Sequence, residues 1–253
     1  MSDIFNNNEQ AAFFNEKAAT WDAKDNHTSA LPGLFTELAG IHENSCVLDI
    51  GCGTGIMFPA FIQAHAHHIT ALDLSTEMLK QAQQKANETF TLLNKDIYTF
   101  KTPERFNAVI MCNVYPHLGD KTQLVDIIKR LLVPGGRFLV CHTLSKDALN
   151  AVHAEQMHKG AQHACGAHDS EGDCHQNNHA SSHENSHDAA SNNNATCGHA
   201  HEHNNASACM PRCHAHVLKD IPTEIACWEN DFVIDVRADT PLFYCFGGYK
   251  REQ

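Results

Sequence analysis

The stretch "VLDIGCGTG", residues 47–55, places three glycines at alternate positions directly after a run of apolar residues. The apolar run is typical of a buried strand, and "GIMFPAFIQAHA", residues 55–66, has a helical pattern. Glycine in a strand-to-helix turn allows positive φ and close approach of a ligand, while the helix N-terminus offers free N–H groups. The sequence therefore predicts a small-molecule cradle at Gly51, Gly53 and Gly55.

Short β-rich runs alternate with helical patterns along most of the chain. Strands are predicted over 46–50, 68–74, 90–96, 106–113 and 136–143, and helices over 55–66, 75–88 and 120–133. We expect Ser75 to cap the second helix, and Gly135 and Gly136 to turn the chain after the third. This alternation predicts an α/β fold with a doubly wound, mostly parallel sheet. In 231–251 two strands stand too close together for a helical crossover, which predicts a terminal antiparallel hairpin.

Residues 153–216 interrupt this alternation. They hold thirteen of the twenty His and five of the eleven Cys, among many Asn, Ser and Ala. Such a composition buries too little apolar surface to offset the ordering of the chain. We therefore expect a core in residues 1–152 that binds a cofactor and begins with a lid helix, a mobile insertion in 153–216, and a helix and hairpin in 217–253 that complete the core.

Charge and hydropathy exclude several classes of partner. Eighteen Lys and Arg against thirty Asp and Glu give a net charge of −12, which argues against binding to nucleic-acid phosphates. We find no apolar stretch long enough to cross a membrane and no export signal at the N-terminus, so we expect a cytoplasmic protein with no membrane partner. In that compartment, cysteines are more often thiols or metal ligands than disulfides.

The spacing of the glycine turn and the acid before it indicate the kind of ligand. The dinucleotide fingerprint is G-x-G-x-x-G, whereas this chain has G-C-G-T-G with Asp49 two residues before Gly51. A carboxylate there would repel a pyrophosphate and would suit a ligand that has an ammonium group and no phosphates. This disfavours a nicotinamide-dependent oxidoreductase.

On these residues the chain resembles the class I S-adenosylmethionine-dependent methyltransferases over roughly residues 10–150 and 217–250. The resemblance implies a seven-stranded Rossmann-like sheet and S-adenosylmethionine as cofactor. It also implies that Asp73 holds the ribose hydroxyls, with Leu74 beside the adenine, and that Asp96 and Ile97 meet the adenine. The segment "CNVYPHL", residues 112–118, which includes Asn113, would lie beside the reactive methyl, and "FFNEKAATWD", residues 13–22, would supply Phe14 and Trp21 as lid residues.

The acceptor side needs few groups, because the sulfonium is already activated and the protein has only to align a nucleophile and remove its proton. No "NPPY" or "DPPY" run follows the fourth strand, so we expect a small-molecule or metalloid acceptor rather than a nucleic-acid base. The candidate catalytic residues are His117, His142 and Tyr115, with the base left open between Tyr115 and a histidine. His117 and His142 stand where carboxyl strand ends gather in doubly wound folds.

A transition metal is the second predicted ligand. His117, His142 and His153, completed by His216 or His214, would form an imidazole site for Zn, Ni or Co. The runs "CGHAHEH" and "CMPRCHAH", within 197–216, add further soft ligands without the paired C-x-x-C spacing of a closed zinc site. The insertion could collect metal, act as a lid ordered by metal, or be a polar loop without a function. An alternative to the enzyme is a metal sensor or storage protein that keeps the methyltransferase fold as a scaffold.

Overall fold

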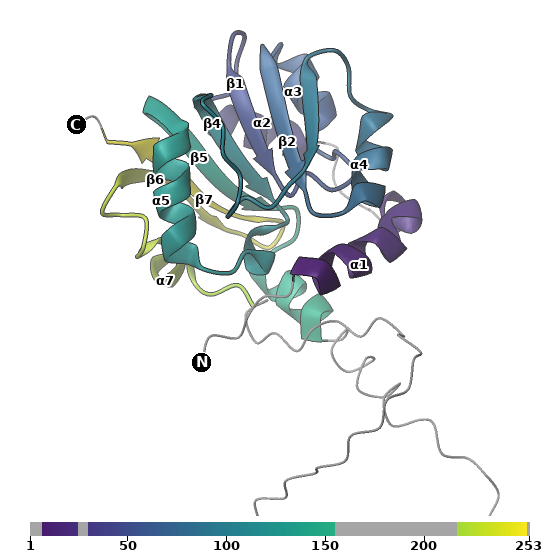
Figure 1. The fold of residues 1–253 in the computed structure, drawn as a ribbon. Coiled ribbons are helices and arrows are strands. Elements are labelled where there is room, and N and C mark those ends of the chain that lie inside the picture. Colours follow the sequence, from purple (N-terminus) through teal and green to yellow (C-terminus); the bar gives the residue numbers. More distant parts are fainter. Residues whose placement is uncertain (1–6, 25–29, 155–216, 252–253) are drawn as a thin grey trace, which may run out of the picture.

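The computed structural model describes residues 7–24, 30–154 and 217–251. Within them one sheet runs in the order β3-β2-β1-β4-β5-β7-β6 (Figure 1). Its strands are β1 (Cys46–Ile50), β2 (His68–Asp73), β3 (Phe90–Asn94), β4 (Phe106–Cys112), β5 (Leu132–His142), β6 (Phe232–Asp239) and β7 (Tyr244–Lys250). The first five pair in parallel, and β7 lies antiparallel between β5 and β6. The predicted doubly wound sheet and its terminal hairpin are both confirmed.

Helices connect the strands, and several begin at the polar caps that the sequence offers. They are α1 (Asn7–Lys17), α2 (Leu31–Leu38), α3 (Phe58–Gln63), α4 (Thr76–Gln83), α5 (Lys121–Leu131) and α7 (Ile221–Ile225), with 3₁₀ turns η1 (Ala18–Thr20), η2 (Asp22–Lys24) and η3 (Tyr115–His117). The Ser75 hydroxyl accepts from Met78 N–H, as predicted, and the Asp120 carboxylate accepts from Gln123 N–H. No helix in the described ranges is long and apolar enough to cross a membrane.

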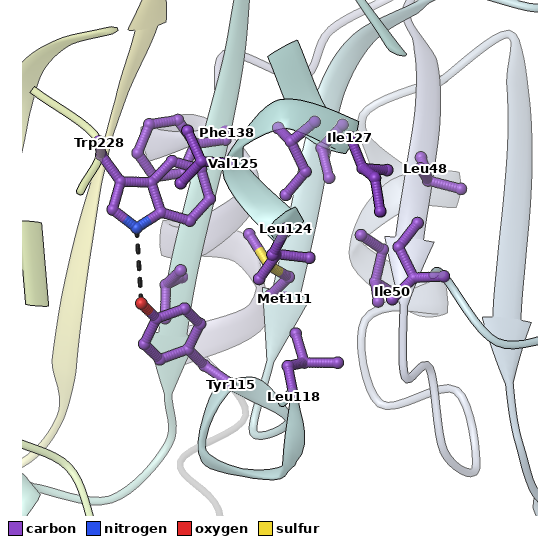
Figure 2. Close-up of a cluster of buried hydrophobic side chains, with 14 of the residues drawn as sticks. Leu48, Ile50, Met111, Tyr115, Leu118, Leu124, Val125, Ile127, Phe138 and Trp228 are labelled. Carbon is purple, nitrogen blue, oxygen red and sulfur yellow. Dashed lines mark hydrogen bonds between the residues drawn. The ribbon is translucent and has the colours of Figure 1, made fainter. Parts of the chain in front are cut away.

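Each face of the sheet packs on its own hydrophobic cluster, since the strands are apolar on both sides. One cluster joins the sheet to α5 and α7, and the other joins it to α2 and α3. In the first, the Trp228 ring stacks on Phe138 with centroids 3.9 Å apart, and its indole N–H donates to the Tyr115 hydroxyl (Figure 2). The helices thus bury both faces of the sheet and leave its carboxyl edge to the loops.

The largest error in a predicted strand boundary is at the fifth strand, which begins at Leu132 and not at residue 136. Leu132 pairs with Phe106, and the register then shifts before Ala108 pairs with Arg137. Gly135, at φ +70°, lies inside this irregular part of the strand. The glycines therefore lie within this irregular part of the strand and do not precede it.

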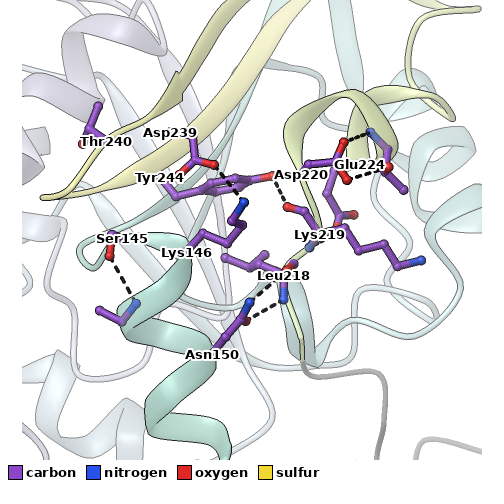
Figure 3. Close-up of polar contacts among 12 residues, drawn as sticks. Ser145, Lys146, Asn150, Leu218, Lys219, Asp220, Glu224, Asp239, Thr240 and Tyr244 are labelled. Carbon is purple, nitrogen blue, oxygen red and sulfur yellow. Dashed lines mark hydrogen bonds and ion pairs between the residues drawn. The ribbon is translucent and has the colours of Figure 1, made fainter.

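The chain returns to the core at residue 217 beside the helical residues 146–154 (Figure 3). The Asn150 amide donates to Leu218 O at 3.0 Å and accepts from Leu218 N–H at 2.9 Å. Lys146 pairs with Asp239 at 3.1 Å, and the Tyr244 hydroxyl donates to Lys219 O. The segments on either side of residues 155–216 are thus fastened together.

Candidate cofactor site

A cavity of about 530 Å³ lies where β1 to β4 end and α1 crosses that edge of the sheet (Figure 1). Its walls come from the turn after β1, the ends of β2 and β4, the residues after β3, and α1. This is the edge at which doubly wound folds bind their ligands. Most of the predicted cofactor residues line it: Gly51, Gly53, Asp73, Leu74, Asp96, Ile97, Asn113 and Trp21.

The glycine turn follows β1 at the floor of this cavity. Gly51 has φ +68°, and a Cβ built on it would lie 2.3 Å from Cγ2 of Val114. The N–H groups of Gly51 and Cys52 donate to Leu72 O at 2.8 and 3.0 Å. The turn is therefore packed tightly between β2 and the loop after β4, in a way that only glycine at position 51 permits.

Asp73 is the acid at the carboxyl end of β2, and its carboxylate is fixed from two sides. Oδ2 accepts from Gly53 N–H and Oδ1 accepts from Ser75 N–H, both at 2.8 Å. Burial raises the pKa of Asp73, and these N–H donors oppose that rise. The result is an oriented carboxylate on the cavity wall, suited to accept hydrogen bonds from a diol.

Asp96, after β3, has a second fixed carboxylate. Its Oδ1 accepts from Tyr98 N–H at 3.0 Å, and its Oδ2 accepts from the side-chain amide of Asn7 at 2.7 Å. Leu74 and Ile97 add apolar surface to the same part of the cavity. An acceptor oxygen beside two aliphatic walls suits a flat heterocycle with an amino group.

Asp49 and Gly55 contribute from behind the cavity and are not among its lining residues. Neither carboxylate oxygen of Asp49 has a hydrogen-bond partner within the described residues. Burial, and then the nearby charge of Asp73, raises the pKa of Asp49 to about 8. Burying an ionised carboxylate that has no partner costs free energy. A cationic ligand in the neighbouring cavity would offset this cost.

The N-terminal segment covers the cavity. Phe14 and Trp21 line it with ring centroids 5.6 Å apart, and Phe14 also contacts the His117 ring at 5.4 Å. The Thr54 hydroxyl donates to Asp22 Oδ1 at 2.5 Å, which ties this segment to the glycine turn. Phe14 and Trp21 therefore lie at the cavity, and their role as a lid stays a prediction.

Asn113 follows β4 with φ +58°, a strained conformation for a residue that is not glycine. Its side chain bridges to the end of β5: Oδ1 accepts from Thr143 N–H at 2.9 Å, and Nδ2 donates to the Thr143 hydroxyl at 3.0 Å. These two hydrogen bonds hold the start of the loop 114–118, which includes His117 and borders the cavity.

The three predicted histidines gather near one another. The rings of His117 and His153 lie 5.6 Å apart, and His153 is one of the groups whose charge acts on His142. His117 lines the cavity, whereas His142 is fully buried and neither of its ring nitrogens has a partner among the described residues. Burial, followed by the charges of His153 and Lys121, lowers the pKa of His142 to about 3. His142 is therefore neutral at physiological pH.

Tyr115 lies in the hydrophobic core and does not line the cavity. Its hydroxyl accepts from Trp228 Nε1–H at 3.4 Å, and burial raises its pKa above the usual value. Lys121 donates to the carbonyls of Tyr115 and Leu118, and its ammonium group lies 4.0 Å from the centre of the Tyr115 ring. These contacts fix the loop that presents His117.

The predicted metal site is not supported by the described residues. Among them no group of three or more His, Cys, Asp or Glu is arranged to hold an ion. His214, His216 and the runs in 197–216 lie outside the described residues, so their metal binding stays a prediction.

Several cavity residues escaped the sequence analysis. Asn7 and Gln10 of α1 line the cavity, and Gln10 donates to His117 O at 3.4 Å. Asn15 accepts from the Ser75 hydroxyl at 2.7 Å and from Glu77 N–H, while Asp22 reaches Thr54. The polar run "NNNEQ", residues 6–10, gave no local signal for the contacts of Asn7 and Gln10, and all of these contacts depend on how the N-terminal segment packs against the core.

The fold and cavity define a doubly wound domain that holds a small ligand at the carboxyl edge of its sheet. Residues 47–136 match the methyltransferase-domain family. The chain is 33% identical over 119 residues to a ubiquinone biosynthesis O-methyltransferase of Xylella fastidiosa (strain 9a5c), covering 44% of this chain and 48% of that protein. It is 27% identical over 140 residues to malonyl-[acyl-carrier protein] O-methyltransferase 2 of Ilyobacter polytropus, covering 53% of each. The chain thus spans about half the length of these relatives.

A solved structure supports the fold. The N-methyltransferase NodS from Bradyrhizobium japonicum WM9, in complex with S-adenosyl-L-homocysteine, superposes with a TM-score of 0.59. The alignment covers 96% of this chain and all of that one at 14% identity. An identity this low supports similarity of fold alone. The family match over residues 47–136 and the shared fold agree with the resemblance to the class I S-adenosylmethionine-dependent methyltransferases.

Proposed function

We propose that this protein transfers a methyl group from S-adenosylmethionine to a small-molecule acceptor. The observation that carries the proposal is the placement of Asp73, whose carboxylate is held by Gly53 and Ser75 N–H groups on the wall of the cavity. In that position the carboxylate can accept hydrogen bonds from both ribose hydroxyls. The cofactor supplies an activated methyl group, and the protein supplies alignment and a proton acceptor.

The other residues fit the remaining parts of the same cofactor. Asp96 offers an acceptor for the amino group of the adenine, with Leu74 and Ile97 against its faces. Gly51 lets the backbone of the turn approach the cofactor closely. Gly53 and Gly55 adopt the positive φ angles that the rest of the turn requires. Asp49 supplies negative charge behind the turn for the ammonium group and the sulfonium.

On the acceptor side we propose that His117 takes the proton. It is the candidate base that lines the cavity, and Phe14, Gln10 and His153 surround it. His142 and Tyr115 would act through the loop around His117, because both are buried behind the cavity. Since the curated relatives carry the names of O-methyltransferases, small molecules with an acidic hydroxyl are the acceptors to test first.

The cofactor assignment is tested by calorimetric titration with S-adenosylmethionine. We expect saturable 1:1 binding that Asp73→Ala abolishes. The matched control is Asp126→Ala, which removes an exposed carboxylate from α5 and should leave the affinity unchanged. Equal affinity in Asp73→Ala and the wild type would refute the assignment.

A metal sensor or storage protein on the same scaffold is the second candidate. The His and Cys content of residues 153–216 favours it, since imidazoles and thiolates suit Zn, Ni and Co. The two candidates differ in their response to the cofactor. Tight metal binding without affinity for S-adenosylmethionine, or without methyl transfer, would favour the scaffold.

A further inference from the structure

Three cysteines form a row across neighbouring strands of the sheet. Cys112 of β4 stands in register with Cys141 of β5, and Cys141 stands in register with Cys245 of β7. Residues in register on neighbouring strands point to the same face of a sheet. All three are free thiols, and all three belong to the hydrophobic cluster on the α2 and α3 face.

The row of cysteines is buried, but Cys112 at one end of it borders the cofactor cavity. Cys141 and Cys245 are fully buried, whereas Cys112 lines the cofactor cavity, as does Cys52 of the glycine turn. Burial raises the pKa of Cys141, and the neighbouring thiols Cys112 and Cys245 raise it further, as expected for side chains in contact. Cys141 and Cys245 are thus protonated at neutral pH unless a metal ion displaces their protons, because burial raises the pKa of both thiols.

The spacing of the row selects a coordination geometry. Neighbouring strands lie about 4.8 Å apart, and metal–thiolate bonds are about 2.3 Å long, so two such bonds in line span adjacent strands. Three cysteines in register on three successive strands lie side by side along the sheet and do not surround one ion. This agrees with the finding that no three ligands of the described residues are arranged around a common point. A linear, two-coordinate thiolate site is characteristic of soft monovalent ions.

We propose that Cys112 and Cys141 bind one Cu(I)-class ion as a linear bis-thiolate, reached from the cofactor cavity. Both S–H protons pass to solvent, two S–metal bonds form, and the oxidation state of the metal does not change. Soft thiolates select Cu(I) over the harder divalent ions. The site is separate from the His/Cys-rich insertion, and it requires no cofactor and no methyl transfer.

The test is an anaerobic titration with Cu(I) against a chromophoric chelator. The starting protein is the full chain with its five cysteines outside the described residues replaced by serine: 165, 174, 197, 209 and 213. We expect that Cys112→Ala and Cys141→Ala each lose one tightly bound Cu(I) per chain. The matched control Cys227→Ala removes a half-buried thiol of the described residues that lies outside the row and should retain the full stoichiometry. Equal uptake by Cys141→Ala, or by Cys112→Ala, and the control would overturn the proposal.

A second measurement does not depend on the folding of core variants. X-ray absorption at the copper edge of the Cu(I)-loaded starting protein should give two sulfur neighbours in a linear arrangement. A shell with nitrogen neighbours, or with three or more sulfurs, would overturn the proposed site. Neither result depends on whether S-adenosylmethionine binds.

Discussion

At the residue scale, Asp49 combines a structural cost with the proposed function. The buried carboxylate has no hydrogen-bond partner among the described residues, and its pKa of about 8 lies above its ordinary value. Between roughly pH 4 and pH 8 the folded protein therefore holds a proton that the unfolded chain has released. The free energy of unfolding should fall as the pH rises through this window.

Asp49→Asn should remove this decrease in the free energy of unfolding with rising pH. Without the cofactor, we expect the variant to be more stable than the wild type at pH 8, by an amount on the order of a few kcal/mol, and similar to it near pH 4. The same variant should bind S-adenosylmethionine more weakly, because it cannot adopt the negative charge that a bound cationic cofactor favours on Asp49. Urea unfolding at both pH values and calorimetry measure the two effects, with Asp126→Asn as the exposed control. A variant no more stable than the wild type at pH 8 would contradict the account of Asp49.

His142 should give stability the opposite dependence on pH. Its folded pKa of about 3 lies below the ordinary 6.5, so the unfolded chain takes up a proton first as the pH falls. The stability that neutral His142 allows is complete above about pH 6.5 and is lost as the pH falls towards 3. His142→Leu should flatten the decline in melting temperature between pH 6.5 and pH 4.5. The exposed control His67→Leu should keep the wild-type decline; the same decline in both variants would show that other groups cause it.

At the element scale, the glycine turn depends on contact between two loops. Gly51→Ala would place a methyl group 2.3 Å from Val114 in a backbone conformation that alanine avoids. We expect a loss of stability of roughly 2–4 kcal/mol, comparable to other overpacked or strained sites, and loss of cofactor binding. Thermal unfolding and calorimetry measure both.

Gly33→Ala is the matched control for this substitution. Gly33 lies in α2 with a negative φ, and no atom lies within 4 Å of an added Cβ. Because alanine is the better helix former, this variant should gain up to about 1 kcal/mol. A loss of stability in Gly33→Ala equal to that in Gly51→Ala would mean that the proposed clash is not the cause.

The elements also show what could be predicted from local sequence. The strand at Cys46–Ile50 was predicted correctly at both ends because a nearly continuous apolar run meets a glycine turn. The helix predicted over 55–66 covers only Phe58–Gln63, since residues 55–57 still belong to the turn. The start of β5 at Leu132 depends on pairing with Phe106, and the contact between Asn7 and Asp96 joins residues 89 positions apart. Local patterns carry no information about either.

At the scale of the whole molecule, the residues that line the cavity were predictable where they sit at strand ends, because the topology brings those ends to one edge. That applies to Asp73, Asp96 and the glycine turn. The acceptor side was less predictable, since the orientation of Tyr115 towards Trp228 is set by core packing. The cytoplasmic location and the metal binding of residues 153–216 stay predictions.

The organisation of the chain predicts that the His/Cys-rich segment can be removed without loss of the fold. We propose that residues 153–216 are an insertion, because Asn150 and Leu218 share two hydrogen bonds while Lys146 reaches Asp239 of the hairpin (Figure 3). These contacts close the core on their own. Deletion of residues 160–212, which leaves 155–159 and 213–216 as the connection, should preserve the melting temperature within a few degrees and leave the affinity for S-adenosylmethionine unchanged.

The Asn150 contacts provide the internal control for this deletion. In the shortened protein, Asn150→Ala should cost about 1–3 kcal/mol, because it removes two hydrogen bonds and leaves the Leu218 backbone groups without a partner. The same substitution in the full chain should cost a similar amount if the segment adds nothing to the closure of the core. If the deletion alone unfolds the protein or removes cofactor binding, residues 160–212 form part of the core or of its site, and the proposed division of the chain is wrong.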